Sequence, residues 1–319
     1  MNSYLLILLL LFLSSLIYLK LAIHFKIIDK PNERSSHTKI TVRGGGIIFT
    51  IAILLCYFLN GYQYPFFTLA VLIVSIVSFL DDIYTLSSKI RFPIQLLAML
   101  LVLYEAQLPF EPMYLYLLIL VCGLGIVNFF NFMDGINGIT GIYSLAVLSG
   151  FFIINNNEQL IDQDLIIYAM ISLVVFGFYN FRKKAIFFAG DIGSITIGIL
   201  IVFIGLLFTI QLSSPLILFL VVVYGADAIL TLFYRKLYTS ESIFDPHRHH
   251  IYQKLVHIKG MSHLKVAMLY GLLQFIINCM IIVNYQKSIQ FQWMLATVLT
   301  LVLIFTYLFI FRKLQRIKI

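Results

Sequence analysis

The chain has 319 residues, of which 61% are hydrophobic and only 11% are charged, and its mean hydropathy is +0.99. Soluble globular domains carry about 25% charged residues, so this composition excludes a soluble protein. The net charge of +8 does not indicate nucleic acid as a partner, because no basic, aromatic-interleaved soluble face accompanies it. The apolar runs are continuous rather than alternating, which favours helices over a membrane β-barrel and predicts a single all-α, polytopic membrane domain over residues 1–319.

Eleven apolar stretches approach the length of about 20 residues that a membrane-spanning helix needs. In chain order, the predicted spans are 2–23, 44–60, 65–80, 92–108, 113–130, 138–155, 164–181, 192–211, 214–233, 265–285 and 290–311. The stretches on either side of residues 61–64 are short, and merging them would leave ten. The first stretch lacks a basic region before it and exceeds the apolar core of about 7–15 residues found in cleavable signals, so we expect it to remain as a span.

The basic residues are confined to alternate connections. One set consists of 24–43, 81–91, 131–137, 182–191, 234–264 and the C-terminal tail. With Lys20 and Lys265 at its margins, this set holds 21 of the 22 Lys and Arg residues and all seven histidines. The positive-inside rule therefore places these loops in the cytoplasm, the N-terminus outside and the C-terminus inside. We expect the chemistry at the cytoplasmic face.

Asp81 and Asp82 end the third predicted span. Carboxylates at a helix C-terminus oppose the helix dipole by about 0.3–1 kcal/mol each, and adjacent like charges add repulsion. A divalent cation, or Lys89 and Arg91 downstream, should offset them. An ordinary charged helix end is the alternative interpretation.

Two further acidic turns stand at predicted helix starts. Asn131, Asp134 and Asn137 lie in a glycine-broken turn before the sixth span, and Asp191 lies in a Gly-Asp-x-Gly-Ser turn that opens the eighth. Helix N-termini favour anions, and glycines allow close approach to the backbone. Simple capping would explain each turn alone, but three acidic clusters at one surface favour a shared site.

The longest inner loop contains His247, Arg248, His249 and His250. Three histidines could bind zinc, whereas an arginine among them favours phosphate; a solvated basic loop against anionic lipid is the alternative. The glycine triplet at 44–46 is a candidate close-approach or phosphate-cradling turn. Asp227, inside the ninth apolar stretch, is expected to face a polar cavity.

Carboxylates for a hard cation, together with basic residues for phosphate, are the equipment of phosphoryl transfer. A transporter of lipid-linked sugars would instead need ionisable residues near the bilayer midplane and paired broken helices. A non-catalytic scaffold would not need three acidic turns on one side.

These segments resemble the polyprenyl-phosphate N-acetylhexosamine-1-phosphate transferase family. The matching features are a loop from Asp29 through Pro31, Asn32, Arg34 and His37 with its glycine triplet, Asp81-Asp82 with Lys89, Arg91 and Gln95, the Asn131 to Gly138 turn, the Gly190 to Ser194 turn, and the histidine loop. The form His247-Arg248-x-His250-x-Tyr252-Gln253 is most similar to the branch that initiates O-antigen or other surface polysaccharides. It is less similar to the branch that makes the first lipid intermediate of peptidoglycan, whose loop has three consecutive histidines.

The resemblance implies transfer of a sugar-1-phosphate from a UDP-N-acetylhexosamine to undecaprenyl phosphate, with release of UMP and with Mg²⁺ or Mn²⁺, at a bacterial inner membrane. It implies that Asp81 and Asp82 are catalytic, with Asp81 a candidate base. It implies that Asp191 is a metal ligand, with Asp82 a second candidate. The residues implied to contact the substrates are Asn131 and Asp134 at the nucleotide sugar, Asn180, and, at the phosphates, Lys89, His247, Arg248 and His250.

Two features depart from the family pattern: Lys184-Ala185 stands where a Pro-Ala pair is common, and Ala189 replaces a Met or Leu. The donor sugar, whether GlcNAc or a 6-deoxy relative such as FucNAc or QuiNAc, stays open, although Tyr252-Gln253 favours a deoxy-amino sugar. A homodimer also stays open.

Overall fold

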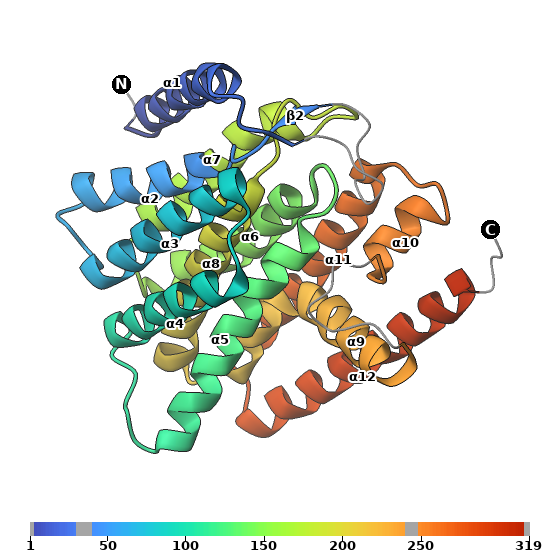
Figure 1. Ribbon diagram of the computed structural model, residues 1–319. Coiled ribbons are helices and arrows are strands. Elements are labelled where there is room, and N and C mark those ends of the chain that lie inside the picture. The colour runs from blue at the N-terminus through green and yellow to red at the C-terminus, as the bar shows by residue number, and fades with distance from the viewer. Residues whose placement is uncertain (1–2, 30–39, 240–247, 316–319) are drawn as a thin grey trace.

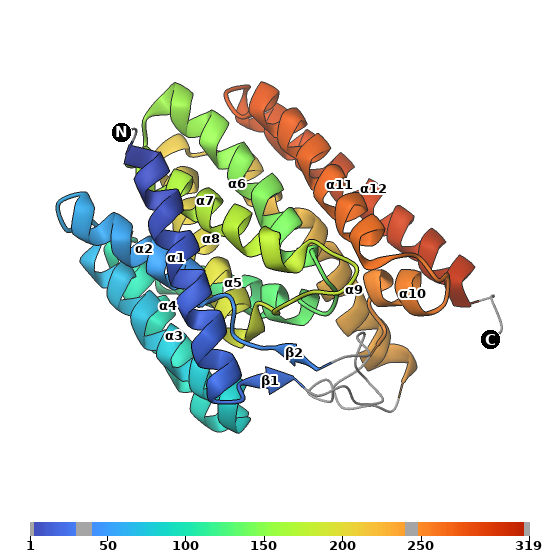
Figure 2. The ribbon, with the colours of Figure 1, turned by 90° about the horizontal axis from the view of Figure 1, so that it is seen from above.

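The computed structural model describes residues 3–29, 40–239 and 248–315. The chain forms a bundle of long helices with short connections (Figures 1 and 2). The helices are α1 (Ser3–His24), α2 (Ile47–Leu59), α3 (Pro65–Tyr84), α4 (Ser88–Glu105), α5 (Met113–Met133), α6 (Ile139–Glu158), α7 (Gln163–Asn180), α8 (Gly190–Leu212), the 3₁₀ helix η1 (Pro215–Val221), α9 (Val222–Tyr238), α10 (Ile251–His257), α11 (His263–Asn284) and α12 (Ile289–Gln315).

Every predicted span is helical, which confirms the all-α polytopic prediction. In the described part of the chain, nine helical segments are long and apolar enough to cross a membrane, η1 and α9 together forming one of them. The two other predicted spans fall short: α2 has only 13 residues, and α4 carries Lys89, Arg91 and Glu105. The count of eleven and the orientation therefore stay predictions.

Helix α8 is the centre of the bundle, with α3 and α5 packed along it (Figure 1). Its residues from Ile192 to Ile204 are buried without interruption, as expected for a helix that is apolar on all sides. The hydroxyl of Thr196 is paired with that of Ser75 at 2.9 Å, and Ser75 is paired with Thr50 at 2.8 Å. These bonds satisfy the buried polar groups and tie α2, α3 and α8 together.

The ninth predicted span is not one α-helix, because the 3₁₀ helix η1 precedes α9. The backbone groups freed at this break are bonded by a side chain of α11: Gln274 accepts a hydrogen bond from the Val223 amide at 3.1 Å and donates to the Phe219 carbonyl at 3.0 Å. A break inside a membrane is tolerated when neighbouring helices supply such partners.

The described parts of the two sets of connections gather at opposite ends of the bundle (Figure 2). At one end, the strands β1 (Ile28–Asp29) and β2 (Thr41–Val42) pair antiparallel, and Val42 bridges to Phe187 before α8. At the other end, Asn60 donates to Asp162 at 2.8 Å and to Asp164 at 3.0 Å. The short helix α10, which sequence periodicity did not predict, lies within the histidine-bearing connection.

Candidate active site

Asp82, the second carboxylate at the end of α3, caps the start of α8. Its Oδ1 accepts from the Asp191 amide at 2.9 Å and its Oδ2 from the Ile192 amide at 3.2 Å. Gly190 has a φ of +72°, and a Cβ there would overlap the Asp82 carboxylate, so this position requires glycine. The helix start does receive an anion, as the sequence indicates, but that anion is a side chain of the protein itself.

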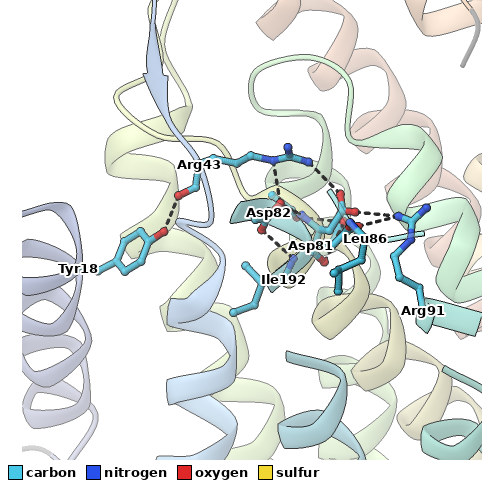
Figure 3. Close-up of polar contacts among 10 residues, drawn as sticks. Tyr18, Arg43, Asp81, Asp82, Leu86, Arg91 and Ile192 are labelled. Atoms are coloured by element: carbon cyan, nitrogen blue, oxygen red, sulfur yellow. Dashed lines mark hydrogen bonds and ion pairs between the residues drawn. The ribbon is translucent and has the colours of Figure 1, made fainter. Parts of the chain in front are cut away.

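Two arginines compensate the carboxylates and reach them from opposite sides (Figure 3). Arg43 Nε lies 2.8 Å from Asp82 Oδ1, and its Nη2 lies 3.5 Å from Asp191 Oδ1. Arg91 Nη1 lies 2.7 Å from Asp81 Oδ2 and 3.2 Å from Asp191 Oδ2. Arg91 is one of the positive partners that the sequence predicts for the Asp81-Asp82 pair, whereas Arg43 was not predicted.

The backbone around Arg43 is tightly packed. Tyr18 of α1 donates a hydrogen bond to the Arg43 carbonyl (Figure 3). The amides of Gly45 and Gly46 donate to the carbonyls of Phe188 and Ala189 at 2.8 and 2.9 Å. The glycine triplet is therefore a close-approach turn, and the Gly45 and Gly46 amides are not available to cradle a phosphate.

A carboxylate can hold a divalent cation most readily through oxygens whose contacts within the protein are weakest. Both oxygens of Asp82 accept backbone amides, and Asp81 Oδ1 accepts from the Leu86 amide. The guanidinium contacts to Asp191 are longer, at 3.2 and 3.5 Å, and its side chain is 15% exposed. Asp191, with Asp81 beside it, is thus the best placed of the three.

No group of three or more His, Cys, Asp or Glu side chains within the described residues is arranged to hold a metal by itself. Magnesium is commonly bound by one or two carboxylates together with substrate phosphates. The hard oxygen donors of Asp191 and Asp81 fit a site of that kind.

The turn between α5 and α6 forms a second acidic feature at the same end. Asp134 accepts a hydrogen bond from Thr140 Oγ1 at 2.6 Å, and burial raises the pKa of its carboxyl to about 6. Asn137 donates to the Arg182 carbonyl at 3.0 Å. Asn131 is partly buried one turn earlier, on α5.

Asn180 has a structural position. Its Oδ1 accepts from the Gly138 amide at 2.7 Å and its Nδ2 donates to the Phe187 carbonyl at 2.9 Å. The buried side chain thereby joins the Asp134 turn to the segment that leads into α8. Its predicted contact with substrate stays a prediction, while the structure supports a positioning role.

The histidine loop is anchored to the bundle through Asp227 of α9. This buried carboxylate accepts from the amides of Ile251 and Tyr252 at 3.0 and 3.4 Å, and from the Tyr270 hydroxyl at 2.6 Å. It therefore caps the start of α10. The expectation of a polar cavity around Asp227 is corrected: its polar surroundings are packed hydrogen-bond donors.

The remaining predicted site residues are buried, exposed at the surface, or outside the described part of the chain. His250 is buried, with Nδ1 3.5 Å from Asp227 Oδ1, and Arg248 is partly exposed beside it. Lys89 is exposed on α4, and among the described residues no ion pair joins it to the site carboxylates. His247, and the loop residues Pro31 to His37, lie outside the described residues.

Sequence reasoning missed Arg43 and Tyr18. Arg43 directly precedes the glycine triplet, and a lone basic residue at an apolar span was attributed to topology. Tyr18 lies within an apolar run, where one hydroxyl carries no distinguishing signal.

The chain is similar to known proteins across most of its length. Residues 64–209 match glycosyl transferase family 4. A probable undecaprenyl-phosphate N-acetylglucosaminyl 1-phosphate transferase of Bacillus subtilis is 26% identical over 310 residues, covering 90% of this chain and 84% of the relative.

Two enterobacterial relatives carry the name undecaprenyl-phosphate alpha-N-acetylglucosaminyl 1-phosphate transferase. The protein of Yersinia pestis is 28% identical over 90% of this chain and 85% of its own length. The protein of Salmonella typhi is 27% identical over 73% of this chain and 70% of its own length.

Proposed function

Since the chain belongs to the polyprenyl-phosphate N-acetylhexosamine-1-phosphate transferase family, we propose that it transfers an N-acetylhexosamine-1-phosphate from a UDP-sugar to undecaprenyl phosphate and releases UMP. The observation that carries this proposal is the joining of Asp81, Asp82 and Asp191 with two arginines at one end of a membrane bundle. This arrangement provides both an oxygen site for a hard cation and cations for phosphates.

The proposed reaction is a single in-line displacement at phosphorus. A phosphate oxygen of undecaprenyl phosphate forms a bond to the β-phosphorus of the UDP-sugar. The bond from that phosphorus to the oxygen bridging the two phosphates breaks, and UMP leaves with the electron pair. Because the attacking phosphate is already anionic, catalysis consists mainly of positioning and charge stabilisation. A route through a covalent phospho-aspartate would need two displacements.

The residues at the site have distinct tasks in this proposal. Asp191, with Asp81 beside it, would hold a bound Mg²⁺, which supplies charge neutralisation of the diphosphate when present. Asp82 holds the start of α8, and thus the backbone of Asp191, in place through two amide bonds. Arg43 and Arg91 provide the positive charge that a triphosphorylated reaction centre, with two donor phosphates and one acceptor phosphate, requires.

An apolar groove of about 580 Å³ supports a polyprenyl acceptor. It runs between α5, η1, α9 and α12 and is lined by Gly125, Gly225 and Leu303, among others. Phe129 and Phe130 line one part of it, directly before Asn131. A hydrocarbon chain in the groove would therefore lie close to the Asp134 turn.

We propose a surface-polysaccharide pathway, because the histidine loop has the form His247-Arg248-x-His250 rather than three consecutive histidines. The alternative is the first lipid intermediate of peptidoglycan. UDP-GlcNAc is the first donor to test, because the names of the relatives specify N-acetylglucosamine; the UDP derivatives of FucNAc and QuiNAc follow.

The test is a UMP-release assay on the purified full-length protein with undecaprenyl phosphate, Mg²⁺ and a panel of UDP-N-acetylhexosamines. UMP should appear with at least one donor and only when the acceptor lipid is present. No release from any donor, by protein that remains monodisperse and folded, contradicts the proposal. Transport of a preformed lipid-linked sugar across vesicles without UMP release would support the transporter alternative.

The metal assignment is tested by Asp191→Asn, which keeps size and hydrogen-bonding capacity but removes the charge. We expect UMP release to fall by at least about 100-fold, which corresponds to about 2.7 kcal/mol, with an unchanged melting temperature. Near-wild-type turnover would remove Asp191 from the site.

A further inference from the structure

Arg91 places one nitrogen between two carboxylates of different helices. Its Nη1 lies 2.7 Å from Asp81 Oδ2 on α3 and 3.2 Å from Asp191 Oδ2 on α8. A cation bridging these two oxygens is what keeps the carboxylates together despite their repulsion. The nitrogen thus stands where a shared divalent ion would have to stand.

The two arginines differ in how firmly they are held. Arg43 contacts Asp82 and Asp191 through two nitrogens, Nε and Nη2, and its main chain is bonded to Tyr18 and Ile27. Arg91 makes both contacts through Nη1 alone, while the two side chains are similarly exposed, at 30% for Arg43 and 34% for Arg91. A guanidinium that is held by a single nitrogen loses both contacts when that nitrogen moves, so Arg91 is the more easily displaced.

The charge balance of the site also favours displacement of Arg91 by a divalent cation. With all three carboxylates ionised, as metal binding requires, the carboxylates and the two arginines sum to −1. A divalent ion that replaces Arg91 brings this sum to zero with Arg43 in place, counted as −3, +1 and +2. An ion added while Arg91 kept both contacts would leave +1 and would bring two cations into contact, which is unfavourable.

We propose that Arg91 is an internal cation of the acidic cluster, and that a divalent metal binds between Asp81 and Asp191 by displacing its guanidinium. This inference rests on the proposed function for its choice of metal. The freed guanidinium keeps five N–H donors and, because its side chain is 34% exposed, would turn away from the metal toward the open side of the site, where a diphosphate would be bound. Arg91 thereby holds the carboxylates in position before metal arrives.

The experiment measures Mn²⁺ binding to the purified full-length protein without any substrate, from the EPR signal of free Mn²⁺. The variant is Arg91→Gln, and the matched control is Lys89→Gln, which removes one positive charge two residues away on the same helix. We expect Arg91→Gln to bind Mn²⁺ on the order of tenfold more tightly than wild type. Lys89→Gln should change the affinity by less than about threefold, since it alters only a longer-range, screened charge.

An Arg91→Gln protein that is folded, by its melting temperature, and binds Mn²⁺ no more tightly than Lys89→Gln overturns the proposal. Wild-type protein provides a second test that does not depend on the folding of a variant. Phenylglyoxal modification of Arg91, followed by peptide mass spectrometry, should rise when Mn²⁺ is added; an unchanged or lower modification overturns displacement. Because neither measurement uses turnover, failure of the UMP assay would contradict the proposed function while leaving the Mn²⁺ result to decide this inference.

Discussion

At the scale of single residues, the aspartate carboxylates of the site have different roles, which depend on the groups that each one contacts. Asp82 is completely engaged by two amides and Arg43, so we assign it to positioning. Asp191 is contacted at longer distances by two guanidinium groups and is partly exposed. The exchangeable contacts, rather than the residue type, make Asp191 the candidate for metal.

Asp134 provides a prediction about pH. Burial raises the pKa of its carboxyl from 3.8 to about 6, so the folded protein holds this proton more tightly than the unfolded chain does. The stabilisation from Asp134 is present below the unfolded pKa and is lost as pH rises through the folded pKa. We therefore expect Asp134→Asn to be less sensitive than wild type to a pH increase from about 4 to 7.

The measurement is the melting temperature of both proteins in one detergent across this range. The difference between wild type and Asp134→Asn isolates this carboxyl from the other titrating groups. Parallel curves for the two proteins would contradict the raised pKa.

At the scale of helices, ends and close contacts organise the site. Helix α8 begins on a carboxylate of α3, and α10 begins on a carboxylate of α9. In both cases the cap comes from another helix, so each capping bond also fixes the relative position of two elements.

Removal of the α10 cap is the second prediction. Asp227→Ala leaves the amides of Ile251 and Tyr252 and the hydroxyl of Tyr270 without this acceptor. Losing a cap costs about 1 kcal/mol, with a range of about 0.5–2, so α10 should open more often. Hydrogen exchange should accelerate in residues 250–258 and stay unchanged in α8. The control is Thr231→Val, which removes the hydrogen bond that Thr231 Oγ1 donates to Asp227 Oδ1 at 3.1 Å but keeps the carboxylate. Equal protection of α10 in the two variants would contradict the capping role.

The third prediction concerns the contact between the starts of α2 and α8. A Cβ on Gly46 would overlap the backbone of Gly193, and backbone cannot move aside as a side chain can. We expect Gly46→Ala to lower the stability by about 1–3 kcal/mol or more, the usual cost of overpacking, and to reduce UMP release. Gly225→Ala on α9, where a Cβ meets nothing within 4 Å, is the control for stability. Equal melting temperatures for the two variants would show that the contact is looser than described.

At the scale of the whole molecule, the bundle separates two chemically different ends. One end joins the residues around Arg43, Asp81, Asp134 and Asp191, and the other joins Asn60 with Asp162 and Asp164. With Lys20 and Lys265 at its margins, the first set of connections also holds 21 of the 22 Lys and Arg residues, which is why we expect it on the cytoplasmic side.

Orientation is the fourth prediction. A reporter fused after Ile319 should have cytoplasmic activity, and one inserted at residues 155–158 should have external activity. Labelling of Asn157→Cys by a membrane-impermeant thiol reagent on intact cells, in a chain with Cys56, Cys122 and Cys279 replaced by serine, provides an independent measurement. A cytoplasmic location for residue 157 would invert the topology and place the proposed site outside.

The helical positions and the segregation of the loops follow from sequence alone, because hydropathy over about 20 residues and the placement of Lys and Arg are properties of single segments. The same holds for the candidate residues, since Asp81, Asp134 and Asp191 each stand in a short local pattern.

Only the tertiary structure decided which donor meets which acceptor. Asp82 caps α8 across 109 positions of sequence, and Arg91 reaches Asp191 across 100. The glycine triplet has its Gly45 and Gly46 amides bonded to Phe188 and Ala189 rather than open to phosphate. Such pairings depend on how distant helices approach one another, and a local pattern contains no information about that approach. For this reason the sequence predicts that Arg91 lies near the Asp81-Asp82 pair, but it does not predict that Arg91 lies between Asp81 and Asp191.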